Sequence, residues 1–231
     1  MKHRLHTLLA SLGLAAILWL PAAAPLPAQS ATDLADVCKS VGDAKLGQWA
    51  SFDATGAGSG GGTLRLALVG TERVGDSTLY WFEVSFAGKD PGRSGTVQIL
   101  SSSLASRSAT PRALIVKYGQ QPAMKVSGEM AGMIGEKGRE NTQAFDFAAR
   151  CNSARVIGWE SVSVPAGTFR ALHMTTVDGG DVWASRDVPF GLVKTHAKQG
   201  DLALTGRGAD AKSSITEKPV DMSGMMTLPK R

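Results

Sequence analysis

The sequence predicts a mainly β protein (α+β class) that begins with one helix, and two features of the chain support this fold class. Its 231 residues include 27 glycines but seven Phe, five Trp and two Tyr, a composition typical of many turns between short strands. Apolar and polar residues alternate with a period of two in several segments, as in residues 63–69 (TLRLALV). A mean hydropathy of -0.04 with 19% charged residues excludes both a disordered chain and a polytopic membrane protein.

The predicted helix follows the amino-terminal segment. Thr32 is placed to cap it, and acidic residues stand in its first turn, where negative charge is favoured. Apolar residues recur with helical spacing at Leu34, Val37, Cys38 and Val41. Cys38 is therefore expected on the buried face of a short amphipathic helix.

Antiparallel strands are predicted through most of the remaining chain. They cover residues 48–53, 63–69, 78–86, 95–100, 112–118, 155–164, 168–177, 181–185, 191–198 and 201–205. In the 78–86 strand (TLYWFEVSF), Phe82 and Phe86 share one face while Trp81 occupies the other, so both faces are expected to be covered. The glycine-rich stretch 55–62 precedes a strand rather than a helix, which favours a hairpin loop over a dinucleotide fingerprint.

The amino terminus has the pattern of a secretory signal peptide. A basic start at Lys2 and Arg4 precedes the apolar run 8–20, and small residues follow as far as Ala28. The run is shorter than the roughly 20 apolar residues of a membrane-spanning helix. We therefore expect residues 1–28 to be removed, by cleavage after Ala28 or after Ser30, and the protein to be periplasmic, or secreted if the source has no outer membrane.

The charge of the mature chain indicates no nucleic-acid partner. Removing residues 1–28 leaves 23 basic and 20 acidic side chains, a net charge of +3, with no basic run or stripe. The sequence predicts no membrane-spanning segment in the mature chain and identifies no protein partner.

Two cysteines, Cys38 and Cys151, remain in the mature chain. An oxidising compartment favours a disulfide between them, and the alternative is two buried free thiols. Because no C-x-x-C motif occurs, neither a redox motif nor a thiolate zinc site is supported.

Residues 122–137 form a methionine-rich segment with weak helical character. Met130 and Met133 belong to an apolar stripe of helical spacing, but glycines interrupt it and favour a marginal, mobile helix or a loop. Three interpretations of its methionines stay open: gap-filling in the core, an adaptable surface for apolar ligands, or soft ligands for Cu(I). A second methionine pair, Met222 and Met225, stands in the tail.

Signals of catalysis are sparse. His173 and His196 are the histidines left after export, in two separate predicted strands, and no G-x-S-x-G or S-x-x-K motif occurs. Carboxylate pairs such as Asp178 with Asp181 are typical of solvated turns. The sequence therefore predicts no enzyme, no cofactor and no histidine metal site.

A family resemblance rests on the carboxy-terminal half. Residues 158–174 (GWESVSVPAGTFRALHM), 182–185 (VWAS) and 188–194 (VPFGLVK) resemble bacterial envelope proteins of the LolA/LolB-like superfamily, with a looser match around residues 47–49 and 80–86. The resemblance implies a curved antiparallel sheet, an incomplete barrel whose concave face is covered by helices and receives acyl chains in the best-known members. It implies a single β domain over residues 29–211. The tail over 212–231, with Pro219, Gly224 and Pro229, is predicted to be poorly ordered.

The leading functional hypothesis is a soluble periplasmic binding or carrier protein. An apolar, lipid-like ligand would lie between the curved sheet and the methionine-rich lid, lined by Trp81, Phe82, Phe86, Met130 and Met133. The alternatives are a non-catalytic structural or interaction protein of the envelope, whose sheet is filled by its own side chains, and a methionine-rich copper-binding protein.

Overall fold

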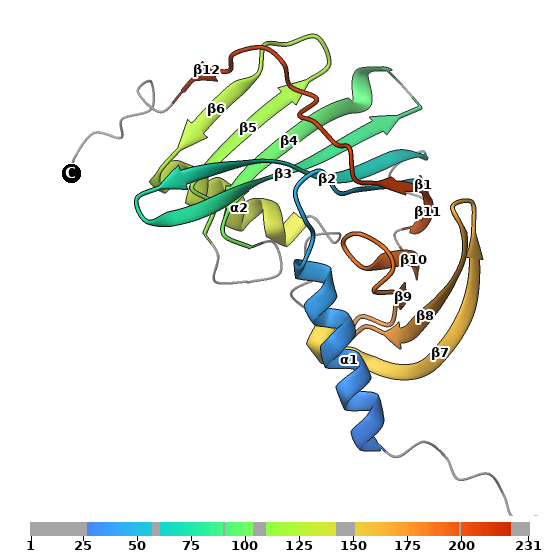
Figure 1. Cartoon of the computed structure of the whole chain (residues 1–231). Coiled ribbons are helices and arrows are strands. Elements are labelled where there is room, and N and C mark those ends of the chain that lie inside the picture. The colour runs from blue at the N-terminus through green and yellow to red at the C-terminus, as the bar shows by residue number, and fades with distance from the viewer. Residues whose placement is uncertain are drawn as a thin grey trace, which may run out of the picture.

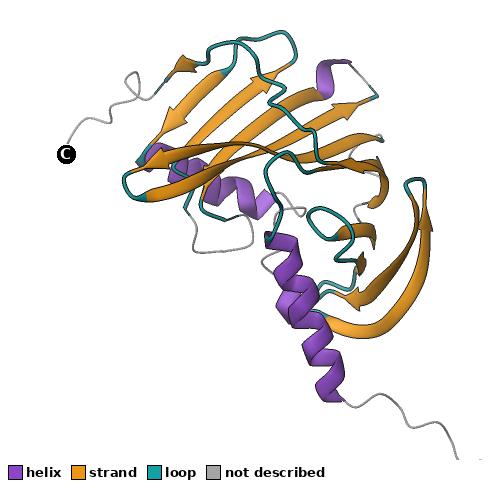
Figure 2. Cartoon of the chain, viewed as in Figure 1, coloured by secondary structure: helices purple, strands orange, loops and turns teal. Residues whose placement is uncertain are grey.

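The residues that the structure describes form a single curved, open sheet with two helices, which confirms the predicted mainly β class (Figure 1, Figure 2). The computed structural model describes residues 27–56, 61–89, 91–103, 110–141, 151–198 and 200–222. The helices in these residues are α1 (Pro27–Gly42) and α2 (Glu129–Asn141), with 3-10 turns at Pro91–Arg93 and Cys151–Ser153.

Twelve strands within the described residues make up the sheet. They are β1 (Trp49–Thr55), β2 (Gly62–Val74), β3 (Ser77–Gly88), β4 (Ser94–Ser101), β5 (Ala113–Tyr118), β6 (Met124–Ser127), β7 (Arg155–Val164), β8 (Gly167–Thr175), β9 (Asp181–Ala184), β10 (Leu192–Ala197), β11 (Gly200–Gly208) and β12 (Val220–Asp221). Their order is β12-β6-β5-β4-β3-β2-β1-β11-β10-β9-β8-β7, and each neighbouring pair is antiparallel except β12 with β6.

Helix α1 forms where the amphipathic pattern predicts and is joined covalently to the sheet. Val37 and Cys38 are buried, and Cys38 forms a disulfide with Cys151, with 5.5 Å between their Cα atoms. The predicted disulfide is therefore present in this structure. The predicted signal peptide lies outside the described residues except for Pro27 and Ala28, the first residues of α1. No helix among the described residues is long and apolar enough to cross a membrane.

The methionine-rich segment forms the strand β6 and the helix α2. Gly128 has a φ of +67° between them, a conformation that favours glycine. Within α2, a Cβ at Gly135 would approach Pro111 Cγ to 2.5 Å, and one at Gly132 would approach Thr110 Cγ2 to 3.0 Å. Gly132 and Gly135 thus allow close packing, although each weakens the helix itself.

The two faces of the sheet have different cores. On the inner face, Phe82 belongs to the main cluster with Phe52, Leu68 and Val37 of α1. Residues of β5 and β6 continue this face and pack against Ala131 of α2, so both helices cover the same side. On the outer face, Trp81 packs with Leu79, Leu100 and Ala113.

The carboxy-terminal segment is ordered as far as Met222, whereas the sequence predicted a poorly ordered tail from residue 212. Residues 209–222, here called the strap, run across the outer face from β11 to β12 (Figure 1). Ile215 is buried against Ile115 and Ala123, and β12 pairs with the edge of β6. The strap shows no periodic pattern of apolar residues in the sequence, because backbone groups and small polar side chains make many of its contacts. Residues 223–231 lie outside the described residues.

Candidate functional site

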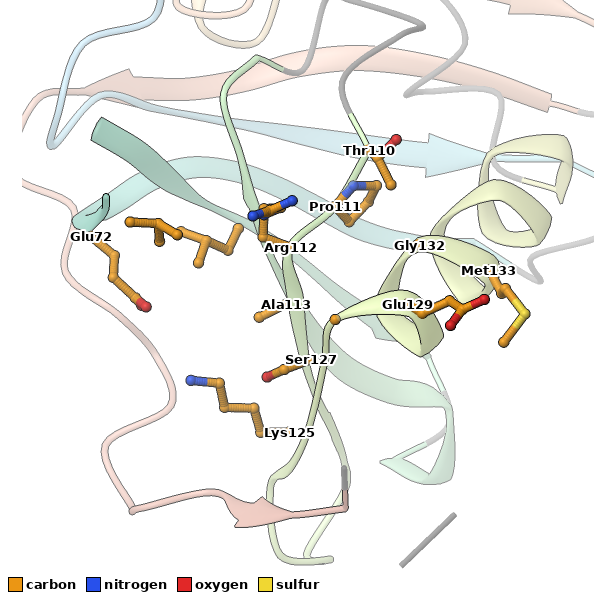
Figure 3. A pocket seen from close by; sticks show the side chains of 13 residues that line it. Glu72, Thr110, Pro111, Arg112, Ala113, Lys125, Ser127, Glu129, Gly132 and Met133 are labelled. Atoms are coloured by element: carbon orange, nitrogen blue, oxygen red, sulfur yellow. The ribbon is translucent and has the colours of Figure 1, made fainter. Parts of the chain in front are cut away.

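A cavity of about 600 Å³ lies at one end of the sheet, and we call it cavity 1 (Figure 3). The end of β2, the start of β5, the end of β6 and the first turns of α2 surround it. Its lining residues are Glu72, Val74, Leu100, Thr110, Pro111, Arg112, Ala113, Lys125, Ser127, Gly128, Glu129, Gly132 and Met133.

The floor of cavity 1 is apolar. Leu100, Pro111 and Ala113 are buried side chains, and Leu100 and Ala113 belong to the outer-face cluster that also holds Trp81. Met133 lies at the α2 side and is 46% exposed. An exposed methionine above buried aliphatic groups provides an adaptable surface for an apolar ligand.

Charged groups border this floor. Glu72 Oε2 accepts a hydrogen bond of 3.1 Å from Trp81 Nε1, and Lys125 Nζ lies 5.8 Å from the centre of the Trp81 ring. In Figure 3 the Glu72 and Lys125 side chains extend toward the same open space. Within the described part of the chain, neither Arg112 nor Lys125 forms an ion pair. Both cations are therefore available to an anionic group.

The predicted lining residues divide between several places. Met133 lines cavity 1, and Trp81 stands beside it through its contacts with Glu72 and Lys125. Phe82 lies in the main core on the opposite face, since successive strand residues point to opposite sides.

The other two predicted residues pack against protein groups. Phe86 contacts Tyr118, with 6.1 Å between ring centres, at the far end of β3. Met130 packs against Leu114 and Val126 beneath α2. The structure thus brings Trp81 and Met133 to one cavity and places the remaining three elsewhere.

Sequence reasoning missed the charged residues of cavity 1. Three elements supply them: Glu72 stands near the end of β2, Arg112 directly precedes β5, and Lys125 lies in β6. Pairing of β5 with β6, and of β2 with β3, brings them together. No local motif encodes this meeting, because strand register depends on the whole sheet.

A second polar group lies on the outer face of β7–β9. His173 bridges two carboxylates, with Nδ1 2.8 Å from Glu160 Oε1 and Nε2 3.2 Å from Asp181 Oδ1. Its ring stacks on Trp183 at 4.4 Å, and Trp183 Nε1 donates to Glu160 Oε2. Both imidazole nitrogens are thus engaged by protein groups.

Hydrogen bonding favours the ionised form of these carboxylates. The bond from Trp183, then that from His173, lowers the pKa of Glu160, and the bond from His173 lowers the pKa of Asp181. Among the described residues, no group of three or more His, Cys, Asp or Glu side chains could hold a metal ion. The arrangement fits a surface ion-pair network.

The structure describes three of the four methionines in the two pairs. Met130 is half-buried and Met133 exposed, and Met222 at the end of the strap packs on the same cluster as Met130. Met225 lies outside the described residues. Copper binding by these thioethers stays a prediction.

Comparison with known proteins gives remote structural likeness. No family model matches the chain, and no curated protein matches it. A candidate exported protein with a YmcC-like fold from Bacteroides fragilis is 11% identical, with a TM-score of 0.34, over 71% of this chain and 97% of that chain.

Two further crystal structures are similar to the same degree. A candidate lipoprotein from Parabacteroides distasonis is 11% identical over 71% of this chain and 96% of its own, with a TM-score of 0.33. A DUF1329 family protein from Desulfovibrio piger is 12% identical over 81% of this chain and 95% of its own, with a TM-score of 0.34. Likeness at this level carries no functional argument, and the LolA/LolB-like resemblance stays a prediction.

Proposed function

We propose that this protein is an extracytoplasmic binding or carrier protein for a lipid-like ligand and that cavity 1 is its binding site. The observation that carries the proposal is the combination of a cavity of about 600 Å³, a buried apolar floor and two cations without ion-pair partners in the described chain. This volume is within the usual range for ligand sites.

The proposed ligand is amphipathic rather than purely apolar. Its apolar part would pack on Leu100, Ala113 and Met133, where burial of apolar surface stabilises the complex. Its anionic end would pair with Arg112 or Lys125. Helix α2 covers the inner face and supplies Gly132 and Met133 to one edge of the cavity.

The disulfide supports a location outside the cytoplasm. A structural Cys38–Cys151 bond is typical of an oxidising environment outside the cytoplasm. A periplasmic carrier is the specific form of this proposal, and it rests on the signal-peptide pattern of the sequence.

Native mass spectrometry tests the binding proposal. Mature protein from a periplasmic extract should carry a lipid-sized adduct, and protein stripped with organic solvent should recover one from palmitate or palmitoyl lysophosphatidylethanolamine. Ala113→Phe, which fills the floor, and Lys125→Gln should each reduce adduct formation. Lys198→Gln, which removes an exposed lysine from the β10–β11 turn, is the matched control. Absence of an adduct with both lipids would contradict the proposal.

A structural or interaction protein is the second candidate, and one observation favours it. The inner face of the sheet is filled by its own side chains, among them the fully buried Phe52, Leu68 and Leu204. For such a protein, the same experiment would give the bare mass under every condition.

A further inference from the structure

A second cavity, of about 530 Å³, lies between α1 and the β7–β8 hairpin, and we call it cavity 2. It shares no lining residue with cavity 1. Its walls include Asp33 of α1, Val156 and Trp159 of β7, Arg170 and Leu172 of β8, and the turn that follows β9.

The apolar surface that cavity 2 offers is aromatic. Trp159 is half-buried and held in place because its Nε1 donates a 2.9 Å hydrogen bond to Asp33 Oδ2. Leu172, its partner on the neighbouring strand, is fully buried and supports the indole without contacting a ligand itself. A fixed, half-buried indole is a suitable surface for a flat apolar group.

One cation in cavity 2 has no carboxylate partner. The guanidinium carbon of Arg170 lies 4.9 Å from the centre of the Trp159 ring. Within the described chain, this stacking is the interaction that the guanidinium makes. Arg186 is different, because its Nη2 pairs with Asp36 Oδ2 at 3.1 Å. Two carboxylates also line the cavity: Asp33, which accepts the indole N–H through Oδ2, and Asp187. Arg170 is therefore the cation available for an anion that enters beside Trp159.

The disulfide joins the two walls of this cavity. Cys38 follows Asp33 on α1, and Cys151 precedes Val156 of β7, each by five residues. Without the bond, α1 would be held against β7 and β8 by side-chain packing and by the Asp33 and Asp36 contacts. Cavity 2 therefore lies where the Cys38–Cys151 disulfide fixes α1 against the inner face of the sheet.

From these contacts we propose that cavity 2 is a second binding site, for a small monocarboxylate with a flat apolar body. The body packs against Trp159, and the carboxylate accepts hydrogen bonds from the Arg170 guanidinium. The Cys38–Cys151 bond holds the site in its binding geometry. This inference does not depend on the proposed function of cavity 1.

Calorimetric titration with three matched probes tests the proposal. The probes are 4-phenylbutyrate, the corresponding neutral alcohol and the corresponding amine, which share one apolar body and differ in charge. The carboxylate should bind wild-type protein, the alcohol more weakly, and the amine least. Arg170→Gln should weaken carboxylate binding by about tenfold, because it removes a charge-assisted pair. Arg155→Gln, which removes an exposed arginine outside the cavity, should leave binding unchanged.

Two further arms separate this site from cavity 1 and test the disulfide. Lys125→Gln should leave phenylbutyrate affinity unchanged, whereas reduction of the disulfide, with circular dichroism to verify folding, should lower it. Equal affinity in Arg170→Gln and Arg155→Gln would overturn the proposal, as would equal binding of the amine or loss of binding in Lys125→Gln. A folded, reduced protein with unchanged affinity would overturn the role of the disulfide.

Discussion

The two ends of the sheet are closed in different ways. At the β7 end, a disulfide joins Cys151, just before the strand, to α1 on the inner face. At the β6 end, the strap crosses the outer face and adds the two-residue strand β12 without any covalent bond. An edge strand exposes unpaired backbone groups and must be covered or interrupted. Here one end depends on a covalent bond and the other on many weak contacts.

The weak contacts of the strap gather around one buried carboxylate. Glu83 is 1% exposed, and its Oε2 accepts hydrogen bonds from Gln98 Nε2 at 2.8 Å and from the Ser214 backbone N–H at 2.9 Å. Its Oε1 has no hydrogen-bond partner and lies 3.7 Å from Arg65 Nη1. Because such a network holds only while every member is in place, we expect the β6 end to open before the β7 end.

Removing the disulfide should produce the largest loss of stability. A Cys38→Ala/Cys151→Ala double variant frees a loop with a sequence separation of 113 residues, which the chain-entropy model values at about 4 to 5 kcal/mol. Urea unfolding of the oxidised wild type and the double variant measures the difference, with the reduced wild type as a second reference. A loss below about 1 kcal/mol would show that packing alone holds α1 to the sheet.

Truncating the buried apolar residue of the strap should have the next largest effect. Ile215→Ala removes a side chain packed against Ile115 and Ala123, and such changes cost about 2 to 4 kcal/mol where the site is well packed. Val220→Ala, which shortens an exposed strap residue, is the matched control. Hydrogen exchange should increase in residues 209–222 of the Ile215 variant but not around Cys38, and uniform exchange along the chain would contradict the comparison.

Replacing the buried carboxylate should come third. Glu83→Ala leaves the Ser214 N–H without its acceptor and Gln98 Nε2 with Ser213 Oγ alone, a loss of about 1 to 3 kcal/mol. Glu83→Gln keeps one acceptor oxygen and should lose less. Urea unfolding ranks the two variants, and equal losses would mean that the charge near Arg65, which both variants remove, rather than the hydrogen bonds, holds the strap.

This comparison also shows how far local sequence reasoning reaches. The strands and the opening helix were predictable because their periods of two and 3.6 are written in consecutive residues, as around Cys38 and Phe82. The strap was not, because its contacts join small polar residues such as Ser214 to side chains more than 100 positions away.

The candidate site was predictable only in fragments. Met133 and Trp81 attract notice as large apolar residues, and both are found at or beside cavity 1. Arg112 and Lys125 have no distinguishing neighbours in the sequence. Their meeting depends on the register that pairs Ala113 with Ser127, which the turn between β5 and β6 and the rest of the sheet decide together.

Acid should weaken the contacts of the strap, and this is the smallest of the expected effects. It tests whether the β6 end of the sheet is more sensitive to pH than the β7 end. The hydrogen bond from Trp49 lowers the pKa of Asp210, and that from Lys117 lowers the pKa of Glu217, both within the strap. A carboxyl whose pKa is lower in the folded state adds stability above its unfolded pKa of about 4, and this stability is lost as the pH falls through the folded value. Because both groups are at the surface, the contribution is small.

Pulse-labelling hydrogen exchange of residues 209–222, after incubation between pH 6 and pH 3, measures this loosening. Protection of the strap should decrease toward pH 3. The region around Cys38 should keep more of its protection, because the disulfide does not titrate, although the lowered pKa values of Glu160 and Asp181 on β7–β9 also cost that end some stability in acid. Asp210→Asn with Glu217→Gln keeps hydrogen-bond acceptors but removes the titrating groups, so its strap should depend less on pH. If the double variant loses protection over the same pH range as the wild type, the titration of these two carboxyls does not control the strap.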